Sequence, residues 1–178
     1  MKKILALVVS LTVIAGVCAG VLAYVNSLTS EPIAAMKVEK ERSAALAVMP
    51  EGVVAVEASS VPDVFTGKDA AGKTLGYAVK GADSGGYGGD IALMVGFEAD
   101  KKTIVCYKAL QSSETPGLGT KLSTPEFSDQ FKGRDASKEL SVKKDGGEIE
   151  AITSATITSR AVCRAVAAAA VKLSAIAK

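Results

Sequence analysis

The pattern of hydrophobic positions changes along this chain, and it begins with one continuous apolar run. Residues 4–25 contain no charged side chain and are almost entirely apolar, and Lys2 and Lys3 precede them. At 1.5 Å per residue, a helix over this run is about 33 Å long, enough to cross the ~30 Å hydrocarbon core of a bilayer. The pattern therefore predicts a transmembrane anchor over residues 1–25.

A cleaved signal peptide is the competing interpretation of this start. Its apolar region usually runs about 7 to 15 residues and ends at a small-residue cleavage site. The run in this chain is longer and ends without an A-x-A sequence, so we expect an uncleaved anchor. Lysines on the short side predict a cytoplasmic N-terminus, with the rest of the chain outside the cell (inner) membrane.

Residues 26–50 have the composition of a connecting helix. Thr29 stands near its expected start, Pro32 fits the first turn, and Pro50 is a stop signal. The remainder of the chain, residues 51–178, has room for one extracytoplasmic domain of ordinary size.

The middle of the chain changes to a β pattern. A strand is expected around residues 75–80, and two β-prone runs at 91–97 and 103–110, joined through residues 99–102, predict a hairpin. Residues 81–90 contain five glycines, which predicts a flexible loop between strands.

The second half contains a loop, a short helix and a long helix. Residues 112–121 include Gly117 and Gly119, which can take positive φ and so predict a tight loop. Phe127 and Phe131 at helical spacing predict a short docked helix. Residues 160–178 predict an amphipathic helix with an apolar stripe formed by Val162, Val166, Ala169, Leu173 and Ile176. The expected fold class is α+β: one transmembrane helix, then a twisted antiparallel sheet with flanking helices.

Composition excludes several kinds of chemistry. The 21 basic and 19 acidic residues nearly balance, so we expect no nucleic acid or other polyanionic partner. There is no histidine, and Cys18, Cys106 and Cys163 lie far apart without metal-ligand spacing. We therefore expect no metal site, and redox chemistry would require an organic cofactor.

A cluster of hydroxyl side chains directly precedes the last helix. A helix needs only one such side chain at its N-cap, so four are unexplained. Arg160 and Arg164 lie in the first turns, where the helix dipole disfavours cations. A phosphate bound there would reverse that penalty, whereas the alternative is a simple cap with solvated arginines. The hydroxyl cluster consists of Thr153, Ser154, Thr156, Thr158 and Ser159.

The segment from Thr153 to Thr156 resembles the S/T-G-A-T motif of the FMN-binding domain family, in which the last threonine is esterified to the phosphate of FMN. Glu150 occupies the acidic position, three residues before the first hydroxyl, that belongs to the recognition pattern of a flavin transferase. This sequence departs from the pattern at two positions, with Ser154 where glycine is usual and Glu150 where aspartate is usual.

The order of further motifs narrows the resemblance. The T-x-x-P-I sequence at 29–33, GYGGDI at 86–91, ETPGLG at 114–119 and the terminal flavin motif follow one another behind a single anchor. Together they resemble the G subunit of Rnf-type electron transport complexes. The related C subunit of sodium-pumping NADH:quinone oxidoreductases shares ETPGLG and the flavin motif, but tends to be longer and has a different loop where this chain has GYGG.

The resemblance implies a redox subunit of an ion-translocating complex that couples ferredoxin and NAD oxidoreduction to sodium or proton translocation. It implies covalent FMN on Thr156, with other complex subunits, the membrane and, during maturation, the flavin transferase as partners. The residues implied near the phosphate are Thr153, Ser154, Ala155, Thr158 and Ser159, and those implied near the ring are Glu114, Thr115, Leu118, Gly119 and Tyr87. The alternatives are a flavin-binding sensory or regulatory domain, and a non-catalytic membrane-anchored scaffold.

Overall fold

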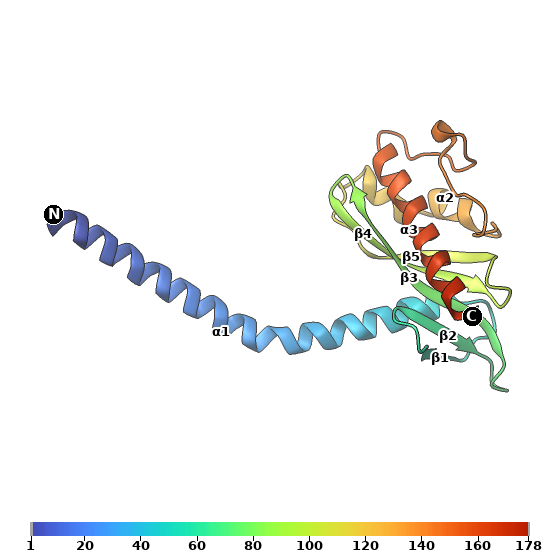
Figure 1. Cartoon of the computed structure of the whole chain (residues 1–178), viewed down its shortest axis with the longest axis horizontal. Coiled ribbons are helices and arrows are strands. Elements are labelled where there is room, and N and C mark those ends of the chain that lie inside the picture. The colour runs from blue at the N-terminus through green and yellow to red at the C-terminus, as the bar shows by residue number, and fades with distance from the viewer. Residues whose placement is uncertain (1, 178) are drawn as a thin grey trace. The chain divides into compact units, whose positions relative to one another are not determined.

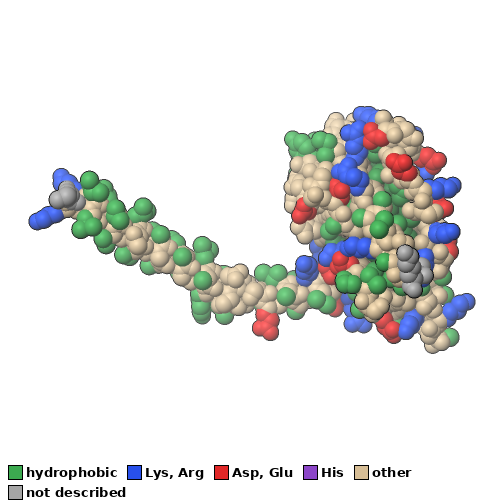
Figure 2. Space-filling model, in the orientation of Figure 1, with side chains coloured by type: hydrophobic (Ala, Val, Ile, Leu, Met, Phe, Trp, Pro, Cys, Tyr) green, Lys and Arg blue, Asp and Glu red, His purple; other side chains and the backbone are tan. Residues whose placement is uncertain are grey.

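A single long helix, α1 (Lys2–Ala47), opens the computed structural model, which describes residues 2–177. The chain divides into two compact units, with the border between Glu39 and Lys40. In the first unit the apolar side chains of α1 are exposed, as Figure 2 shows. By length and composition α1 can cross a membrane, which confirms the apolar N-terminal helix.

The predicted start of a separate connecting helix near Thr29 is wrong, because α1 continues through Pro32. The Thr29 hydroxyl donates to the carbonyl of Val25, at 2.9 Å, inside the continuing helix and so does not cap a new one. The functional borders at residues 25 and 50 remain predictions.

The second unit contains a five-stranded antiparallel sheet in which each strand pairs with the next along the chain (Figure 1). This arrangement confirms the antiparallel sheet and the hairpin between its last two strands. The first two strands are short, and the sequence analysis did not find them. The strands are β1 (Ala55–Ala58), β2 (Val64–Lys68), β3 (Thr74–Gly86), β4 (Gly89–Glu98) and β5 (Ile104–Gln111).

The flexible loop predicted over residues 81–90 is wrong. β3 continues to Gly86 and β4 begins at Gly89, so that only Tyr87 and Gly88 form the turn of a long hairpin. Glycine is required at position 81 by close packing, because a Cβ there would lie 2.0 Å from the carbonyl oxygen of Ala165. These glycines serve the approach of a helix and the tight turn rather than flexibility.

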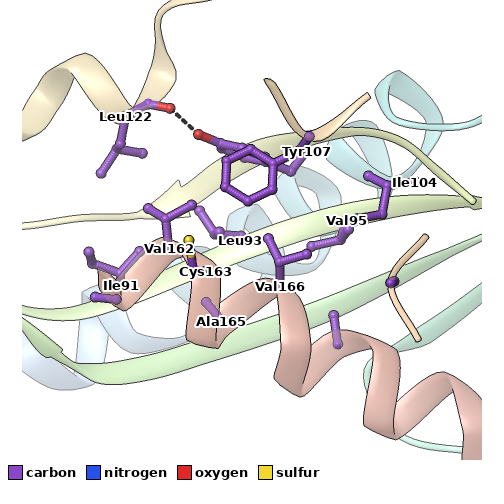
Figure 3. Packing of buried hydrophobic residues seen from close by; sticks show 14 of the residues in the cluster. Ile91, Leu93, Val95, Ile104, Tyr107, Leu122, Val162, Cys163, Ala165 and Val166 are labelled. Atoms are coloured by element: carbon purple, nitrogen blue, oxygen red, sulfur yellow. Dashed lines mark hydrogen bonds between the residues drawn. The ribbon is translucent and has the colours of Figure 1, made fainter. Parts of the chain in front are cut away.

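Strand β4, which lies between β3 and β5, is buried on both faces of the sheet. Its residues alternate between two hydrophobic clusters. One cluster lies between the sheet and helix α3 (Thr156–Ser174), as Figure 3 shows. The other contains Ala44 and Ala45 in the last turn of α1, and Val48 and Met49, which directly follow the helix.

Helix α3 confirms the predicted amphipathic helix, although it begins four residues earlier than expected. Val162, Val166, Ala169 and Leu173 are buried against the sheet. Ile176 lies beyond α3 in the short helix η4 (Ala175–Ala177) and packs partly against the same cluster.

The segment between β5 and α3 contains four short helices, and aromatic contacts hold part of it. Phe127 and Phe131 are buried with their rings 5.7 Å apart, edge to face, which confirms the predicted short helix. The Tyr107 hydroxyl donates to the carbonyl of Leu122 and ties this segment to β5 (Figure 3). The helices are η1 (Gly119–Ser123), α2 (Pro125–Ser128), η2 (Asp129–Phe131) and η3 (Lys143–Asp145).

Cys106 and Cys163 are free thiols that belong to different clusters, one on each face of the sheet. Burial raises the pKa of the Cys163 thiol to about 11, so this side chain is protonated at neutral pH. It acts as a packing residue on the buried face of α3.

Candidate functional site

A cavity of about 470 Å³ opens at the beginning of α3, and we call it the α3 cavity. Three parts of the chain form it: the β3–β4 turn, the loop from residue 114 to η1, and the first turn of α3. The lining residues are Tyr87, Glu114, Thr115, Leu118, Gly119, Ser154, Ala155, Thr156, Ile157 and Thr158.

Nine of the eleven residues implied by the resemblance thus lie around one cavity, and Ile157 is a lining residue that the sequence analysis missed. Its place between Thr156 and Thr158 was the available signal. Thr153 and Ser159 do not line the cavity. Thr153 borders a smaller hollow of about 200 Å³ together with Glu150.

Ser159 has a structural task instead. It is fully buried, and its hydroxyl accepts a hydrogen bond from the backbone N–H of Ile152 at 2.9 Å while donating to the carbonyl of Ala155 at 2.9 Å. Both hydrogen-bonding functions of the hydroxyl are therefore used to fold the turn before α3 onto the helix.

Ser154 has a left-handed backbone conformation, with φ of 64°. An L-residue with a Cβ pays roughly 1–2 kcal/mol for this conformation, whereas glycine adopts it freely. This gives a physical reason for the glycine that is usual at this position of the motif, and it makes Ser154 a strained substitute.

The first turn of α3 is open to an anion. Ala155 is the N-cap, and no side chain of the described residues caps this end of the helix. The first backbone N–H groups of a helix have no partner within it, and together with the helix dipole they favour a negatively charged group. Thr156, the first residue of α3, is half-buried in the cavity wall, and its Oγ1 accepts a hydrogen bond from Lys144 Nζ at 3.4 Å.

The two arginines have carboxylate partners within the protein, which neither of the two alternatives drawn from the sequence included. Arg160 forms two hydrogen bonds to Asp145, at 2.7 and 2.6 Å, and Arg164 forms two to Asp83, at 2.9 and 2.8 Å. These hydrogen bonds hold the pKa of both carboxyl groups below the usual value for aspartate. The negative charge that balances the two arginines therefore comes from carboxylates of the protein itself. Neither arginine lines the cavity.

Glu114 connects the three walls of the cavity. One carboxylate oxygen accepts from the Thr158 hydroxyl at 2.7 Å, and the other accepts from the backbone N–H of Gly88 at 3.2 Å. Glu114 is buried, and among the described residues it makes no ion pair. Glycines make room for it, because a Cβ at Gly86 or Gly119 would lie 2.7 or 2.4 Å from its oxygens.

Exposed apolar side chains surround the opening of the cavity. Tyr87 is 72% exposed, Ile157 48% and Leu118 42%. The loop that carries Leu118 is tight as predicted, with Gly117 at φ 77° and its N–H bonded to Thr120 Oγ1 at 3.0 Å. Gly119, the other glycine of the loop, has ordinary φ and is needed instead for its contact with Glu114.

Known proteins are similar to this chain in sequence and in fold. Residues 86–171 match the FMN-binding domain family. The crystal structure of the C subunit of Na(+)-translocating NADH-quinone reductase from Parabacteroides distasonis is similar, with a TM-score of 0.51 and 29% identity over 62% of this chain and 61% of that chain. NqrC of Shewanella oneidensis has the same TM-score at 22% identity, over 76% of this chain and 74% of that chain, and shares the fold. The class is therefore an FMN-binding domain that follows an apolar N-terminal helix.

Two relatives extend over nearly the whole chain. The G subunit of the ion-translocating oxidoreductase complex of Methanosarcina acetivorans is 33% identical over 90% of this chain and 89% of that protein. The G subunit of the Na(+)-translocating ferredoxin:NAD(+) oxidoreductase complex of Acetobacterium woodii is 35% identical over 90% and 87%. The chain belongs to the family of G subunits of ion-translocating oxidoreductase complexes, which confirms the resemblance drawn from its motifs.

The residues around the α3 cavity fit FMN. The volume of the cavity lies within the range of about 300–1,000 Å³ that small-molecule sites have. Free N–H groups, the Thr156 hydroxyl and the Lys144 ammonium suit a phosphate, while Tyr87, Leu118 and Ile157 suit a flat aromatic ring.

Proposed function

We propose that this chain is the electron-transfer subunit of a membrane complex that couples ferredoxin:NAD(+) oxidoreduction to ion translocation, with FMN held through a phosphoester on Thr156. The Acetobacterium woodii relative is named for sodium translocation. The relative from Clostridium ljungdahlii, 43% identical over 53% of this chain and 51% of that protein, is named for proton translocation. The proposal therefore covers either ion.

The observation that carries the covalent part is the contrast within the hydroxyl cluster. Thr158 and Ser159 are buried and bonded within the protein, and Thr153 does not line the α3 cavity. Thr156 lines the cavity at the uncapped start of a 19-residue helix, where an anion is favoured. Ser154 also lines it, but lies before the helix and outside the position that the motif assigns to the ester.

In the attachment step, a flavin transferase uses a flavin dinucleotide as the donor of FMN. The bond between the Thr156 oxygen and the flavin phosphorus forms, the pyrophosphate bond of the donor breaks, and a nucleoside monophosphate leaves. The hydroxyl proton is lost to solvent or to a base of the transferase. The chain gains the mass of one FMN less water. Glu150, in the position expected for transferase recognition, lies beside Thr153 in the small hollow next to this site.

Each group of this chain then has a separate task. The α3 N–H groups and Thr156 hold the phosphate, and Tyr87, Leu118 and Ile157 cover apolar ring surface and exclude water from it. Glu114 keeps the three walls together. Bound FMN supplies the capacity to accept and release electrons.

For topology, we propose that residues 1–25 anchor the chain in the cell (inner) membrane with a cytoplasmic N-terminus, and that residues 26–50 lead to an extracytoplasmic FMN domain over residues 51–178. Lys2 and Lys3 before the apolar run support this orientation. Protease added to sealed, right-side-out vesicles should digest the FMN domain. Full protection of the domain in those vesicles would contradict the proposed orientation.

The covalent part is tested by mass spectrometry of the full chain produced together with a flavin transferase. The intact protein should carry one FMN less water, and fragmentation of the peptide over residues 145–160 should locate it on Thr156. An unmodified chain from a host with active transferase contradicts covalent attachment. FMN on another hydroxyl of the cluster contradicts the assignment of Thr156.

A further inference from the structure

The turn before the flavin motif contains a cation that is not paired. In η3, Lys143 forms an ion pair with Glu150 at 2.8 Å, and Asp145 is held by Arg160. Lys144, between them, makes no ion pair with any residue in the range 2–177. Its ammonium instead contacts the Thr156 hydroxyl oxygen, at 3.4 Å.

The backbone around Lys144 is closed on itself. The N–H groups of Asp145 and Gly147 donate to the carbonyl of Val142 at 2.8 and 3.1 Å, and Lys143 N–H donates to the carbonyl of Ile149 at 2.8 Å. Gly146 has φ of 87°, which only glycine adopts readily and which reverses the chain. The turn is thus an ordered support, and it brings Lys144 to the start of α3.

Of the four cations Lys143, Lys144, Arg160 and Arg164, Lys144 alone has no carboxylate partner among the described residues. The sequence suggested Arg160 and Arg164 as phosphate partners, but carboxylates bind both of them. Lys143 is likewise paired. Asp145, the next residue in the sequence, is engaged by Arg160, and no carboxylate of the described chain lies within ion-pair distance of Lys144.

We propose that Lys144 is a positioning residue for the phosphate of FMN at Thr156. Before attachment, its ammonium donates to the Thr156 oxygen and offsets the repulsion that an incoming anionic donor meets. After attachment, the same ammonium pairs with the negative charge of the phosphodiester. Lys144 keeps its proton throughout, and the bonds that form and break are those given for the attachment step. The inference rests on the proposed function.

The test compares attachment rates of full-length chains in detergent with purified flavin transferase and a limiting concentration of flavin dinucleotide. Intact mass gives the modified fraction at each time. Lys144→Gln should slow attachment about five- to tenfold, Lys144→Met should do the same, and Lys144→Arg should restore most of the rate. Lys138→Gln is the matched control, because Lys138 is an exposed lysine on the same stretch of chain and makes no ion pair with the described residues, and it should remain close to wild type.

Two further readouts separate an electrostatic role from a structural one. Raising the salt concentration should slow wild type towards the rate of Lys144→Gln and leave that variant nearly unchanged. In the modified proteins, the ³¹P resonance of the phosphodiester should shift with Lys144→Gln and not with Lys138→Gln. Circular dichroism verifies that all variants are folded.

The outcomes distinguish this inference from the proposal beneath it. If wild type gains no FMN on Thr156, the proposed function fails. If wild type is modified on Thr156 but Lys144→Gln matches Lys138→Gln in rate, salt dependence and ³¹P resonance, the role of Lys144 is overturned and the ester on Thr156 stands.

Discussion

Two neighbouring regions at the beginning of α3 carry the same functional group in different surroundings. In the buried region, the hydroxyls of Thr158 and Ser159 have partners within the protein, at 2.7 and 2.9 Å. In the open region, Ser154 and Thr156 face the α3 cavity, and the contact of Thr156 is an exposed lysine side chain. A hydroxyl that already satisfies buried polar groups stabilises the fold, whereas a hydroxyl with a replaceable partner is available for chemistry.

The substitution with the largest expected effect is Thr156→Val, which keeps the β-branched shape and removes the hydroxyl oxygen. All covalent FMN should be lost, while the free energy of unfolding changes by less than about 0.5 kcal/mol because no buried partner is left unsatisfied. Intact mass and urea unfolding of the unmodified proteins measure the two quantities. FMN that persists on this variant would remove Thr156 from the site.

The same substitution at Thr158 should have the reverse effects. Thr158→Val should keep the covalent FMN but lose about 1.5–3 kcal/mol of stability, because the buried Glu114 carboxylate loses a charge-assisted hydrogen bond. In the background of Glu114→Gln, the cost of Thr158→Val should fall, which a double-mutant cycle detects. An equal cost in both backgrounds would mean that the two side chains are not coupled.

Ser159→Ala should lower the free energy of unfolding by about 1–2 kcal/mol, since the backbone N–H of Ile152 loses its acceptor. Ser174→Ala is the matched control on the same helix, because the Ser174 hydroxyl is exposed and only donates to the carbonyl of Val171. The control should change stability by less than about 0.5 kcal/mol. Similar losses for both would argue against a structural role specific to Ser159.

The smallest expected effect belongs to the open region. Ser154→Gly should raise the free energy of unfolding by about 0.5–1 kcal/mol, because glycine relieves the left-handed strain at φ 64° and loses only part of that gain to backbone entropy. Ser128→Gly is the control in ordinary helical geometry, with φ of −67°, and should be destabilising by a similar amount. A loss of stability with Ser154→Gly would show that its side chain, and not its backbone, matters there.

Much of the molecule could be predicted from patterns that are local in the sequence. An uncharged apolar run determines a helix suited to a membrane, a spacing of three and four residues determines the buried face of α3, and two β-prone runs with a short polar connection determine the β4–β5 hairpin. The motif from Thr153 to Thr156 pointed to FMN without any structure. β1 and β2 were not predicted because both strands are short and β1 is largely exposed. Little alternation of hydrophobic and polar residues therefore marks them.

Tertiary structure decided what each polar residue contacts. Pairing between β3 and β4 turned the glycine-rich segment 81–90 into the end of a hairpin. It also placed Asp83 beside Arg164, 81 residues away. Packing of α3 on the sheet joined Thr158 to Glu114 across 44 residues, and the turn of η3 brought Lys144 to Thr156. Periodicity reports which face of an element is buried because burial follows from local spacing, but the partner of a charge or a hydroxyl depends on strand register and helix docking, which are properties of the whole fold.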